Sequence, residues 1–504
     1  MEHVIVMQKG ELWYGGAIED GIKMPVGEKD IYSIDLTVNR TYNQASSCFI
    51  STFGRYILSE KGFCISFFKG QIKVSDPFGC VRFGETGGGL REAFLAVSCS
   101  FDKTNEIPPK EVFTPQYCTW IELLYNQNQK DIEHYAQKII DCGFPAGILI
   151  IDDNWQEDYG VWEFHNRRFP DPKKMMDKLH SLGFKVMLWV VPYVSPDNRI
   201  FRENKDLFVH TSKGEIAVRE WWNGYSAILD MSNPKTFDFL DEQLNRLMKL
   251  YGVDGFKFDG GDPSYLREDD LYFAPSSPNE QSRLWALYAQ KYEFNELRSG
   301  FNTGGARLVN RLCDKFHSWD TGNGLKSLIP CALQASLLGY TFVCPDMIGG
   351  GQYADFAAGK PIDEELFIRS CQASALMPTM QFSFAVWEHL SQNAIKICQN
   401  AAELHGKFFK YIYQLALNSL KSSEPILRPM CYSGSEECER ALSDQFMLGD
   451  KYLVAPVLEK GCTKRTVLFP EGKWIDPYDG HIYGRGVYEI AAPLEKIPYF
   501  EKVE

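Results

Sequence analysis

Between residues 117 and 420 the chain alternates short apolar segments with helical patterns, and this alternation limits its fold more than any other feature. AGILIIDDNW is an apolar segment that ends in acids, and FPDPKKMMDKLHSLG is a helical pattern with Pro near its start and Gly after its end. FKVMLWVVPYV and VDGFKFD continue the series. Strands that alternate with helices pair in parallel, and several units of about thirty residues favour a closed (β/α)8 TIM barrel over an open sheet. The sequence has no GxGxxG motif or P-loop to support a nucleotide-binding sheet.

In the segments on either side of this region, apolar residues do not recur at helical spacing over any length. Before it, IYSIDLTV, SSCFISTFG, FCISFFKGQIKV and FLAVSCSF are typical of short strands, and the Pro-rich EIPPKEVFTPQ indicates a linker. After it, DQFMLGDKYLVAPVLEKG and KRTVLFPEGKWIDPYDG are again typical of strands with turns. We therefore predict an N-terminal β-sandwich (1–111), a catalytic barrel (112–420) and a C-terminal β-sandwich domain (421–504).

Composition and charge limit the kinds of molecule that this protein is expected to bind. The net charge of -13 comes without any basic block, which argues against nucleic acid, and no apolar run is long enough to cross a bilayer. MEHVIVMQKGELWYGG lacks the pattern of a signal peptide, and the fourteen cysteines are scattered, without a CxxC pair. We expect a cytoplasmic protein with buried, reduced thiols such as Cys99. Nine histidines without a His-x-His pair give little support to a metal mechanism, and no cofactor is expected.

The segment GVDGFKFDGGD (252–262) delivers an aspartate, Asp259, from an apolar strand directly into two glycines. In a β/α barrel that end of the strand faces the active site. A carboxylate there, beside glycines that allow a close approach to the backbone, suits a nucleophile. The segment alone supports equally well an aspartate that caps the next helix.

Acids and aromatic residues recur together at the predicted strand ends. For a single Trp, burial in the core is the better interpretation, and for a single Asp a cap or turn is the default. Their repeated combination favours a carbohydrate site, because aromatic faces cover the apolar faces of a sugar and carboxylates accept bonds from its hydroxyls. Two carboxylates can also share the work of cleaving a glycosidic bond. The residues concerned are Asp152, Asp153, Trp155, Trp189, Trp221, Trp222, Asp259, Asp262, His317, Trp319, Asp320 and Asp346.

At these positions the chain resembles glycoside hydrolase family 31, a family of retaining α-glycosidases, and most closely its α-galactosidase-like branch. The resemblance is carried by ILIIDDNWQEDYGVWEFHNRRFPDP, LHSLGFKVMLWVVPYV, WWNGYSAILDMSNP, GVDGFKFDGGDPSYL and GLKSLIPCALQASLLGYTFVCPDMIGGG. EPILRPM and DQFMLGDKYLVAPVL match the family's pattern after the barrel. It covers the whole barrel, and we expect it to extend over all 504 residues.

The resemblance implies roles for individual residues. Asp259 would be the nucleophile that forms a covalent glycosyl-enzyme, and Arg311 would help to keep it ionised. Asp152 or Asp153 would accept bonds from sugar hydroxyls, and Trp221 and Trp222 would wall the pocket. The remaining residues expected to bind substrate are Trp189, Lys257, Trp319, Asp346 and Gln381.

The sequence departs from the family's pattern at the acid/base. Family members usually carry Trp, two residues and then the acidic Asp, but here the segment is HSWDTGNGL and Gly322 stands at that spacing from Trp319. Asp320 is the only carboxylate between Trp319 and Leu325, so we assign it the role, while Asn323 could not donate the required proton. Where the glucosidase branch carries Arg-x-His, this chain has Met380, Gln381 and Phe382.

We therefore predict an exo-acting, retaining α-glycosidase for a terminal α-linked hexose, most closely α-galactosidase-like, with an oligosaccharide or glycoside as substrate. α-Glucosidase or α-N-acetylgalactosaminidase activity within the same family is an alternative. A weakly active or non-catalytic carbohydrate-binding protein is the alternative from another class, and the displaced acid/base supports it. The sequence does not fix the oligomeric state.

Overall fold

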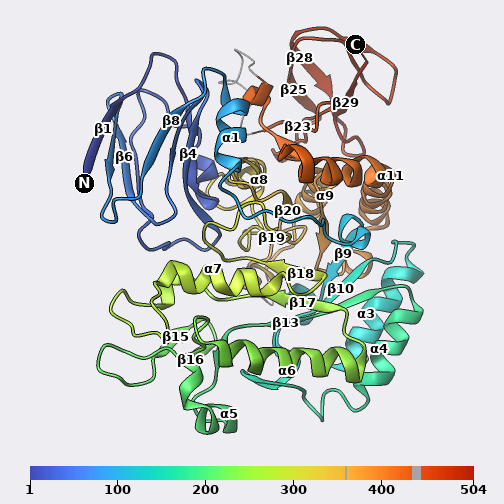
Figure 1. Cartoon of the computed structure of the whole chain (residues 1–504). Coiled ribbons are helices and arrows are strands. Elements are labelled where there is room, and N and C mark those ends of the chain that lie inside the picture. The colour runs from blue at the N-terminus through green and yellow to red at the C-terminus, as the bar shows by residue number, and fades with distance from the viewer. Residues whose placement is uncertain (358–359, 434–443, 504) are drawn as a thin grey trace.

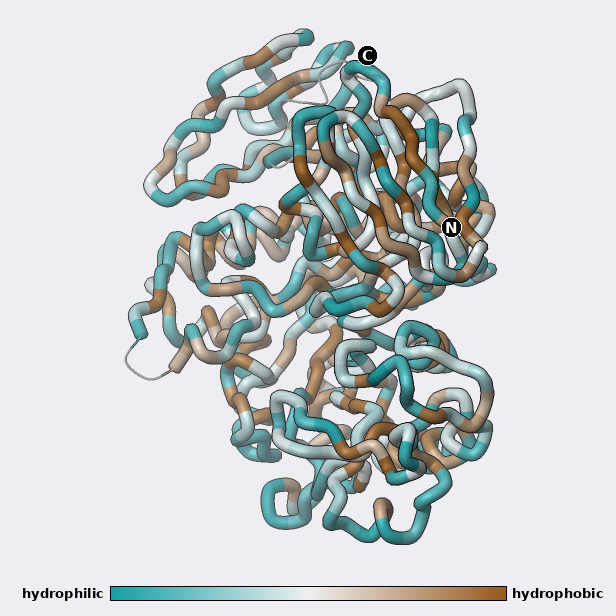
Figure 2. The backbone as a smooth tube through the Cα atoms, turned by 90° about the vertical axis from the view of Figure 1, so that its left-hand side faces the viewer, coloured by the Kyte–Doolittle hydropathy of each residue, from teal (hydrophilic) through white to brown (hydrophobic). Residues whose placement is uncertain are grey.

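The N-terminal part of the chain is a sandwich of antiparallel strands (Figure 1). The computed structural model describes residues 1–357, 360–433 and 444–503, and within them this part has two four-stranded sheets, ordered β1-β7-β6-β3 and β2-β4-β5-β8. Phe67 and Ile72 of one sheet and Phe49 of the other are buried in one cluster. In Figure 2 apolar and polar residues alternate along these strands, as expected for sheets with one buried face. The strands are β1 (Glu2–Val6), β2 (Trp13–Ala17), β3 (Tyr32–Asp35), β4 (Ala45–Ser51), β5 (Arg55–Leu58), β6 (Cys64–Phe68), β7 (Gln71–Ser75) and β8 (Arg82–Glu85).

The prediction of a strand at FLAVSCSF was wrong, because this segment belongs largely to helix α1 (Leu90–Ser98). Leu90, Ala93, Phe94 and Val97 are buried at helical spacing, and the apolar run begins in the middle of that face. Cys99, which follows the helix, is exposed rather than buried. All the cysteines of the described ranges are free thiols, and most are buried.

The middle of the chain is a parallel barrel, as predicted. Within the described ranges its eight strands follow the order β20-β19-β18-β17-β13-β10-β9-β21, and a parallel bridge between Met347 and Gln381 joins the two ends of this order. Figure 1 shows the helices packed around these strands. The strands are β9 (Pro115–Cys118), β10 (Ile148–Ile151), β13 (Lys185–Val190), β17 (Gly255–Phe258), β18 (Phe294–Leu297), β19 (Val309–Arg311), β20 (Phe342–Cys344) and β21 (Met380–Phe382).

The barrel helices begin and end at residues that suit their positions. Asn233 accepts a bond from the backbone N–H of Lys235 at the start of α6, Pro234 occupies its first position, and Gly252 ends it with a φ of 81°. Asp171 caps α4 in the same way. The helices are α2 (Trp120–Leu123), α3 (Gln129–Asp141), α4 (Pro172–Ser181), α5 (Arg199–Glu203), α6 (Pro234–Tyr251), α7 (Pro278–Ala289), α8 (Leu325–Leu337), α9 (Glu364–Ser374), α10 (Val386–His389) and α11 (Gln392–Ser422).

Short antiparallel strands are inserted after two of the barrel strands. After β10, β11 (Gln156–Asp158) pairs with β12 (Val161–Phe164). After β13, β14 (Tyr193–Val194) and β15 (Val218–Trp221) both pair with β16 (Gly224–Ile228). The two tryptophans predicted to lie in a connecting loop are therefore at the turn of a hairpin, where Trp221 is the last residue of β15 and Trp222 follows it.

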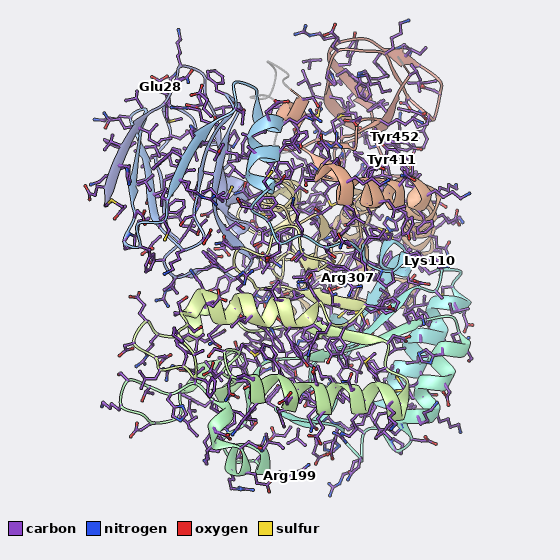
Figure 3. The ribbon with its side chains drawn as sticks, viewed as in Figure 1. Glu28, Lys110, Arg199, Arg307, Tyr411 and Tyr452 are labelled. Carbon is purple, nitrogen blue, oxygen red and sulfur yellow. The ribbon has the colours of Figure 1, made fainter. Side chains whose placement is uncertain are left out.

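The C-terminal part is again made of β-strands, and it packs against α11. In the described residues it has a six-stranded sheet, ordered β22-β23-β24-β29-β26-β27, and the pair β25-β28. Tyr411 of α11 meets Tyr452 of β24 with ring centroids 5.1 Å apart (Figure 3), and Phe408 contacts Tyr452 and Tyr499. The strands are β22 (Leu427–Arg428), β23 (Phe446–Leu448), β24 (Tyr452–Val454), β25 (Lys464–Phe469), β26 (Trp474–Ile475), β27 (Ile482–Tyr483), β28 (Gly486–Ala491) and β29 (Tyr499–Lys502).

None of the helices in the described ranges combines the length and the apolar character that a membrane span requires.

Candidate active site

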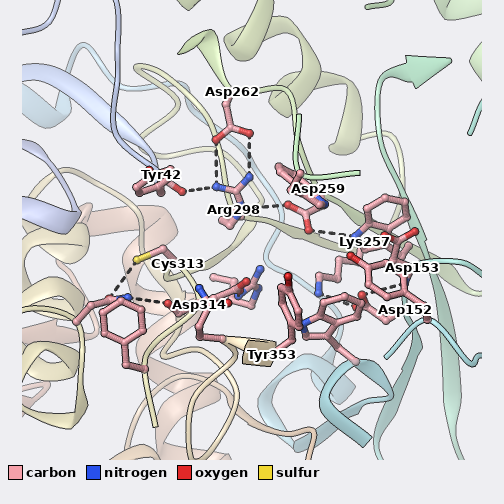
Figure 4. Close-up of a pocket in the computed structure, with 18 of the residues that line it drawn as sticks. Tyr42, Asp152, Asp153, Lys257, Asp259, Asp262, Arg298, Cys313, Asp314 and Tyr353 are labelled. Atoms are coloured by element: carbon pink, nitrogen blue, oxygen red, sulfur yellow. Dashed lines mark hydrogen bonds and ion pairs between the residues drawn. The ribbon is translucent and has the colours of Figure 1, made fainter. Parts of the chain in front are cut away.

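A cavity of about 440 Å³ lies at the carboxyl ends of the barrel strands (Figure 4). Twelve residues were given catalytic or binding roles through the family resemblance, and seven of them line it: Asp152, Asp153, Trp189, Trp222, Lys257, Asp259 and Arg311. Its other lining residues are Tyr42, Trp120, Tyr125, Asp262, Tyr265, Arg298, Cys313, Asp314, Phe316, Asn323, Gln352 and Tyr353.

Asp259 follows β17 directly and is held in place by three donors. Arg298 Nε and the backbone N–H of Gly260 donate to Oδ1 over 3.0 and 2.8 Å, and Trp189 Nε1 donates to Oδ2 over 3.0 Å. Gly260 has a φ of +63°, and a Cβ there would come within 2.8 Å of the Tyr193 ring. The first glycine after the strand is therefore required both for the turn and for the packing around the carboxylate.

The charges around Asp259 keep it ionised. Its burial raises the pKa, but the positive charges of Arg298, Lys257 and Arg311 outweigh this effect, and the pKa lies well below its ordinary value. Arg298 has the largest influence of the three and also binds both oxygens of Asp262, over 3.0 and 2.8 Å. An ionised, hydrogen-bonded carboxylate on the cavity wall is suited to attack a carbon that bears partial positive charge.

Arg298 was not predicted from the sequence. The expectation had placed Arg311 beside the nucleophile, but in the structure Arg298 makes the direct contact and Arg311 acts through its charge alone. The position of Arg298 offers a signal in hindsight, because it follows strand β18 just as Asp259 follows β17.

Asp152 and Asp153 lie side by side after β10 but have different surroundings. Lys257 Nζ donates to Asp152 over 2.7 Å in a fully buried ion pair, and Asp152 raises the pKa of Lys257 although burial opposes this. Asp153 accepts bonds from Tyr159 and Asn223 over 3.1 and 2.6 Å. Burial, followed by the charge of Asp152, raises the pKa of Asp153 to about 7.

Arg311 organises a second group of carboxylates. Its Nη1 lies 2.7 Å from an oxygen of Asp314 and 2.7 Å from an oxygen of Asp346, and its Nε lies 3.2 Å from Glu296. Asp346 is fully buried behind the cavity wall, and burial, reinforced by the charge of Asp314, raises its pKa to about 6. Asp314 reaches the cavity, and 39% of its side chain is exposed.

The structure places Asp320 outside the set of residues that line the cavity. Its Oδ1 accepts bonds from the backbone N–H groups of Gly322, Asn323 and Gly324, so its carboxylate forms the turn before α8. Burial alone would raise its pKa, but a bond from Ser318 and these backbone bonds lower it. A general acid needs a pKa raised towards the working pH, and this environment has the opposite effect.

Four other predicted residues also lie outside the cavity wall. Trp319 donates to Asp363 over 2.9 Å, and Trp221 donates to Ser226 over 3.0 Å beneath Trp222. Gln381 is buried and donates to Glu296 over 2.6 Å, while Asp346 supports Arg311 as described. The structure therefore gives these four residues supporting contacts and no place on the cavity surface.

Exposed aromatic side chains surround the mouth of the cavity. Tyr42, Tyr125, Trp222, Phe316 and Tyr353 all line it, with exposed fractions between 37% and 70%. They come from five separate segments, including the N-terminal domain, which supplies Tyr42. Large aromatic groups gathered at one opening are typical of a binding surface for a ring with an apolar face.

In the described ranges no group of three or more His, Cys, Asp or Glu residues is arranged to hold a metal ion.

Similarity to known proteins agrees with this geometry. Residues 105–415 match the TIM-barrel domain of glycosyl hydrolases family 31, and residues 423–503 match the C-terminal domain of the same family. The mouse myogenesis-regulating glycosidase is 33% identical over 415 residues, which cover 79% of this chain and 58% of the mouse protein. A 1,3-alpha-isomaltosidase from Kribbella flavida is 25% identical over 71% of this chain and 56% of its own length.

Solved structures share the fold. A family 31 sulfoquinovosidase from E. rectale, in complex with an aza-sugar inhibitor, superimposes with a TM-score of 0.85 over 99% of this chain and 82% of its own, at 18% identity. This chain spans under three-fifths of the length of the two curated relatives named above. The two domain matches, which together cover most of the sequence, show that the chain belongs to glycosyl hydrolase family 31.

Proposed function

We propose that the protein is a retaining exo-α-glycosidase that releases a terminal α-linked hexose, with galactose as the first candidate. The observation that carries this proposal is the pair Asp259 and Asp314, two carboxylates on different sides of one cavity (Figure 4). In a double displacement one carboxylate attacks the sugar and the other serves as acid and then as base. The other class, a binding protein without catalysis, would not require the charges that keep Asp259 ionised.

Asp259 attacks the anomeric carbon and forms a covalent glycosyl-enzyme in this mechanism. Arg298 keeps the carboxylate ionised, and Trp189 fixes its second oxygen in place. Asp152 and Asp153 lie on the same wall as acceptors for sugar hydroxyls, and Trp222 offers an aromatic face to the ring.

Asp314 takes the role of acid/base that the sequence had led us to assign to Asp320. Its Oδ1 binds Arg311, while its Oδ2 has no hydrogen-bond partner among the described residues. This free oxygen can protonate the leaving oxygen and later remove a proton from the attacking water, which gives net retention. Asp153 is a weaker candidate despite its raised pKa, because it is buried and already accepts bonds from Tyr159 and Asn223.

Galactose is proposed because this chain lacks the Arg-x-His pattern of the glucosidase branch. Met380, Gln381 and Phe382 form β21 at that place, and all three are buried. The aromatic mouth fits a leaving group that presents a flat or apolar face, such as a second sugar ring.

The test is a screen of 4-nitrophenyl α-galactoside, α-glucoside and α-N-acetylgalactosaminide, with Asp259→Asn as the inactive control. Release from one sugar, lost in the variant and giving an α-configured first product by NMR, would support the proposal. A β-configured first product would refute it. If the protein releases nitrophenol from none of the three substrates but binds sugar measurably, the result would favour a binding protein without catalysis.

The acid/base is tested with two leaving groups. Nitrophenolate departs without protonation, so Asp314→Ala should reduce turnover far more on an α-linked disaccharide, by about 10²–10⁴-fold, than on the nitrophenyl glycoside. Added azide should restore part of the turnover as the α-glycosyl azide. Asp320→Ala is the matched control, and a larger loss for it than for Asp314→Ala would return the role to Asp320.

A further inference from the structure

Strands β18 and β19 lead into the two halves of the proposed active site, and their backbones pair over a short stretch only. Only one Cα pair, Leu297 with Asn310, defines their register, whereas β17 and β18 share four such pairs. The connecting residues 298–308 are all described and contain no helix. Arg298, which holds Asp259, follows β18, and Arg311, which holds Asp314, ends β19. Inside the barrel the two strands are also joined by the Glu296–Arg311 ion pair at 3.2 Å and by a bond from the Val309 N–H to Asn295 Oδ1 at 3.1 Å. At their catalytic ends, contacts from outside the barrel add to these.

A loop of the N-terminal domain supplies those contacts. Asn43, which is buried, donates from Nδ2 to the backbone carbonyls of Arg298 and Arg311 over 3.1 Å each, and its Oδ1 accepts from the backbone N–H of Cys313 over 2.7 Å. An asparagine amide offers N–H donors and an oxygen acceptor, and here both bind the chain at the catalytic ends of β18 and β19, while Nδ2 also lies 3.3 Å from Gln44 Oε1.

The neighbouring residues of the loop strengthen the same junction. Gln44 donates to the carbonyl of Leu297 and to the side chain of Asn310, over 3.2 and 3.3 Å. The backbone carbonyl of Tyr42 accepts a short bond from Arg298 Nη1. In Figure 4 Tyr42 lies beside Arg298 at the edge of the cavity.

We propose that Asn43 is a positioning residue, which fixes the distance between the nucleophile and the acid/base by joining the two strand ends. The proposal rests on the function proposed above, since it assumes that Asp259 and Asp314 act together. It implies that a loop of the N-terminal β-sandwich helps to hold the active-site residues in place. A misplacement of the order of 1 Å between reacting groups costs roughly a hundredfold in rate.

Asn279 provides a matched control across the same domain interface. It lies on α7, is buried, donates from Nδ2 to the carbonyls of Leu36 and Thr37 over 3.0 and 3.1 Å, and accepts from the N–H of Asn39 over 2.8 Å. Its bonding pattern is the same as that of Asn43, but none of its partners belongs to a catalytic strand. Asn279→Ala therefore reports the effect of removing, from the same interface, an amide that does not bind a catalytic strand and reaches Asn43 only through Asn39.

The test compares Asn43→Ala with Asn279→Ala in the full chain. Both should lower the melting temperature by similar amounts, but only Asn43→Ala should reduce kcat, by roughly 10–100-fold with a smaller change in KM, and shift the pH profile of kcat. Equal effects of the two variants on kcat and on the pH profile would overturn the proposal. If Asn43→Ala does not fold, Asn43→Ser, which leaves a smaller void, is used instead. The same fall in kcat is expected, and effects equal to those of Asn279→Ala would again overturn the proposal.

Hydrogen exchange gives a second measurement that does not depend on turnover. The peptide that contains the Cys313 amide should exchange faster in Asn43→Ala than in wild type, and it should be unchanged in Asn279→Ala. Unchanged exchange in Asn43→Ala would overturn the proposal even if activity falls. If the wild-type protein hydrolyses none of the glycosides, the proposed function is contradicted. The hydrogen-exchange rate of the Cys313 peptide would still decide whether Asn43 holds the strand ends.

Discussion

Replacing Arg298 by methionine would remove the cation that two buried carboxylates share. The guanidinium makes three bonds to carboxylates, one to Asp259 over 3.0 Å and two to Asp262 over 3.0 and 2.8 Å, and a further bond to the Tyr42 carbonyl. Only 9% of the arginine side chain, 12% of Asp259 and 3% of Asp262 are exposed. Water therefore cannot replace the lost bonds without rearrangement of the site.

We expect Arg298→Met to lower the free energy of unfolding by about 3–5 kcal/mol, the usual cost of leaving a buried charge without its partner. It should also raise the pKa of Asp259, because the positive charge with the largest influence on that carboxylate is gone. Asp259 must be ionised to attack, so activity is lost when the pH falls through its pKa. The acidic limb of kcat/KM should therefore move to higher pH in the variant.

The double variant Arg298→Met with Asp262→Asn separates buried charge from lost packing. Removing both members of a pair costs less than removing one, so the double variant should be more stable than Arg298→Met alone. The measurements are melting temperatures and pH–rate profiles of the four proteins of the cycle. A double variant no more stable than the single one, or an acidic limb that does not move, would refute the reasoning.

Other predictions concern single positions. Asp320→Ala should lower the unfolding free energy by about 1 kcal/mol through loss of its turn, measured by urea denaturation, with kcat near that of wild type; a large fall in kcat would contradict this. Lys257→Met should destabilise the protein by about 3–5 kcal/mol, because Asp152 stays buried without its cation, and a change below about 1 kcal/mol would count against that pair. The pKa of Asp153 is raised from 3.8 to about 7 on folding, so stability from its protonated form is complete below pH 3.8 and is lost as the pH rises to about 7. Asp153→Asn should therefore gain in melting temperature relative to wild type between pH 4 and 7, and a constant difference would contradict the shift. Trp222→Ala should raise KM more than it lowers kcat, since this ring lies at the mouth of the cavity.

Much of the fold could be predicted from local patterns. Alternating apolar and helical segments indicated the barrel, and the Pro and Gly positions around α4 marked its ends because these residues restrict the backbone in known ways. The prediction of a strand at FLAVSCSF was wrong because a short apolar run does not distinguish a strand from the buried face of a helix. Only with Leu90 and Ala93 included does the helical period become visible.

The sequence made Asp259 the candidate nucleophile, because its place between an apolar strand and two glycines allowed that role and the resemblance to a known family assigned it. Which other groups face it was decided by the tertiary structure. Arg298, Asp314 and Asn43 belong to different segments, and their distances depend on how barrel strands and a loop of another domain pack together. Asp320 was assigned as the only carboxylate between Trp319 and Leu325, but in the structure it accepts bonds from the neighbouring backbone N–H groups. Backbone geometry is set by residues a few positions apart, whereas the chemistry of a cavity is set by residues that only folding brings together.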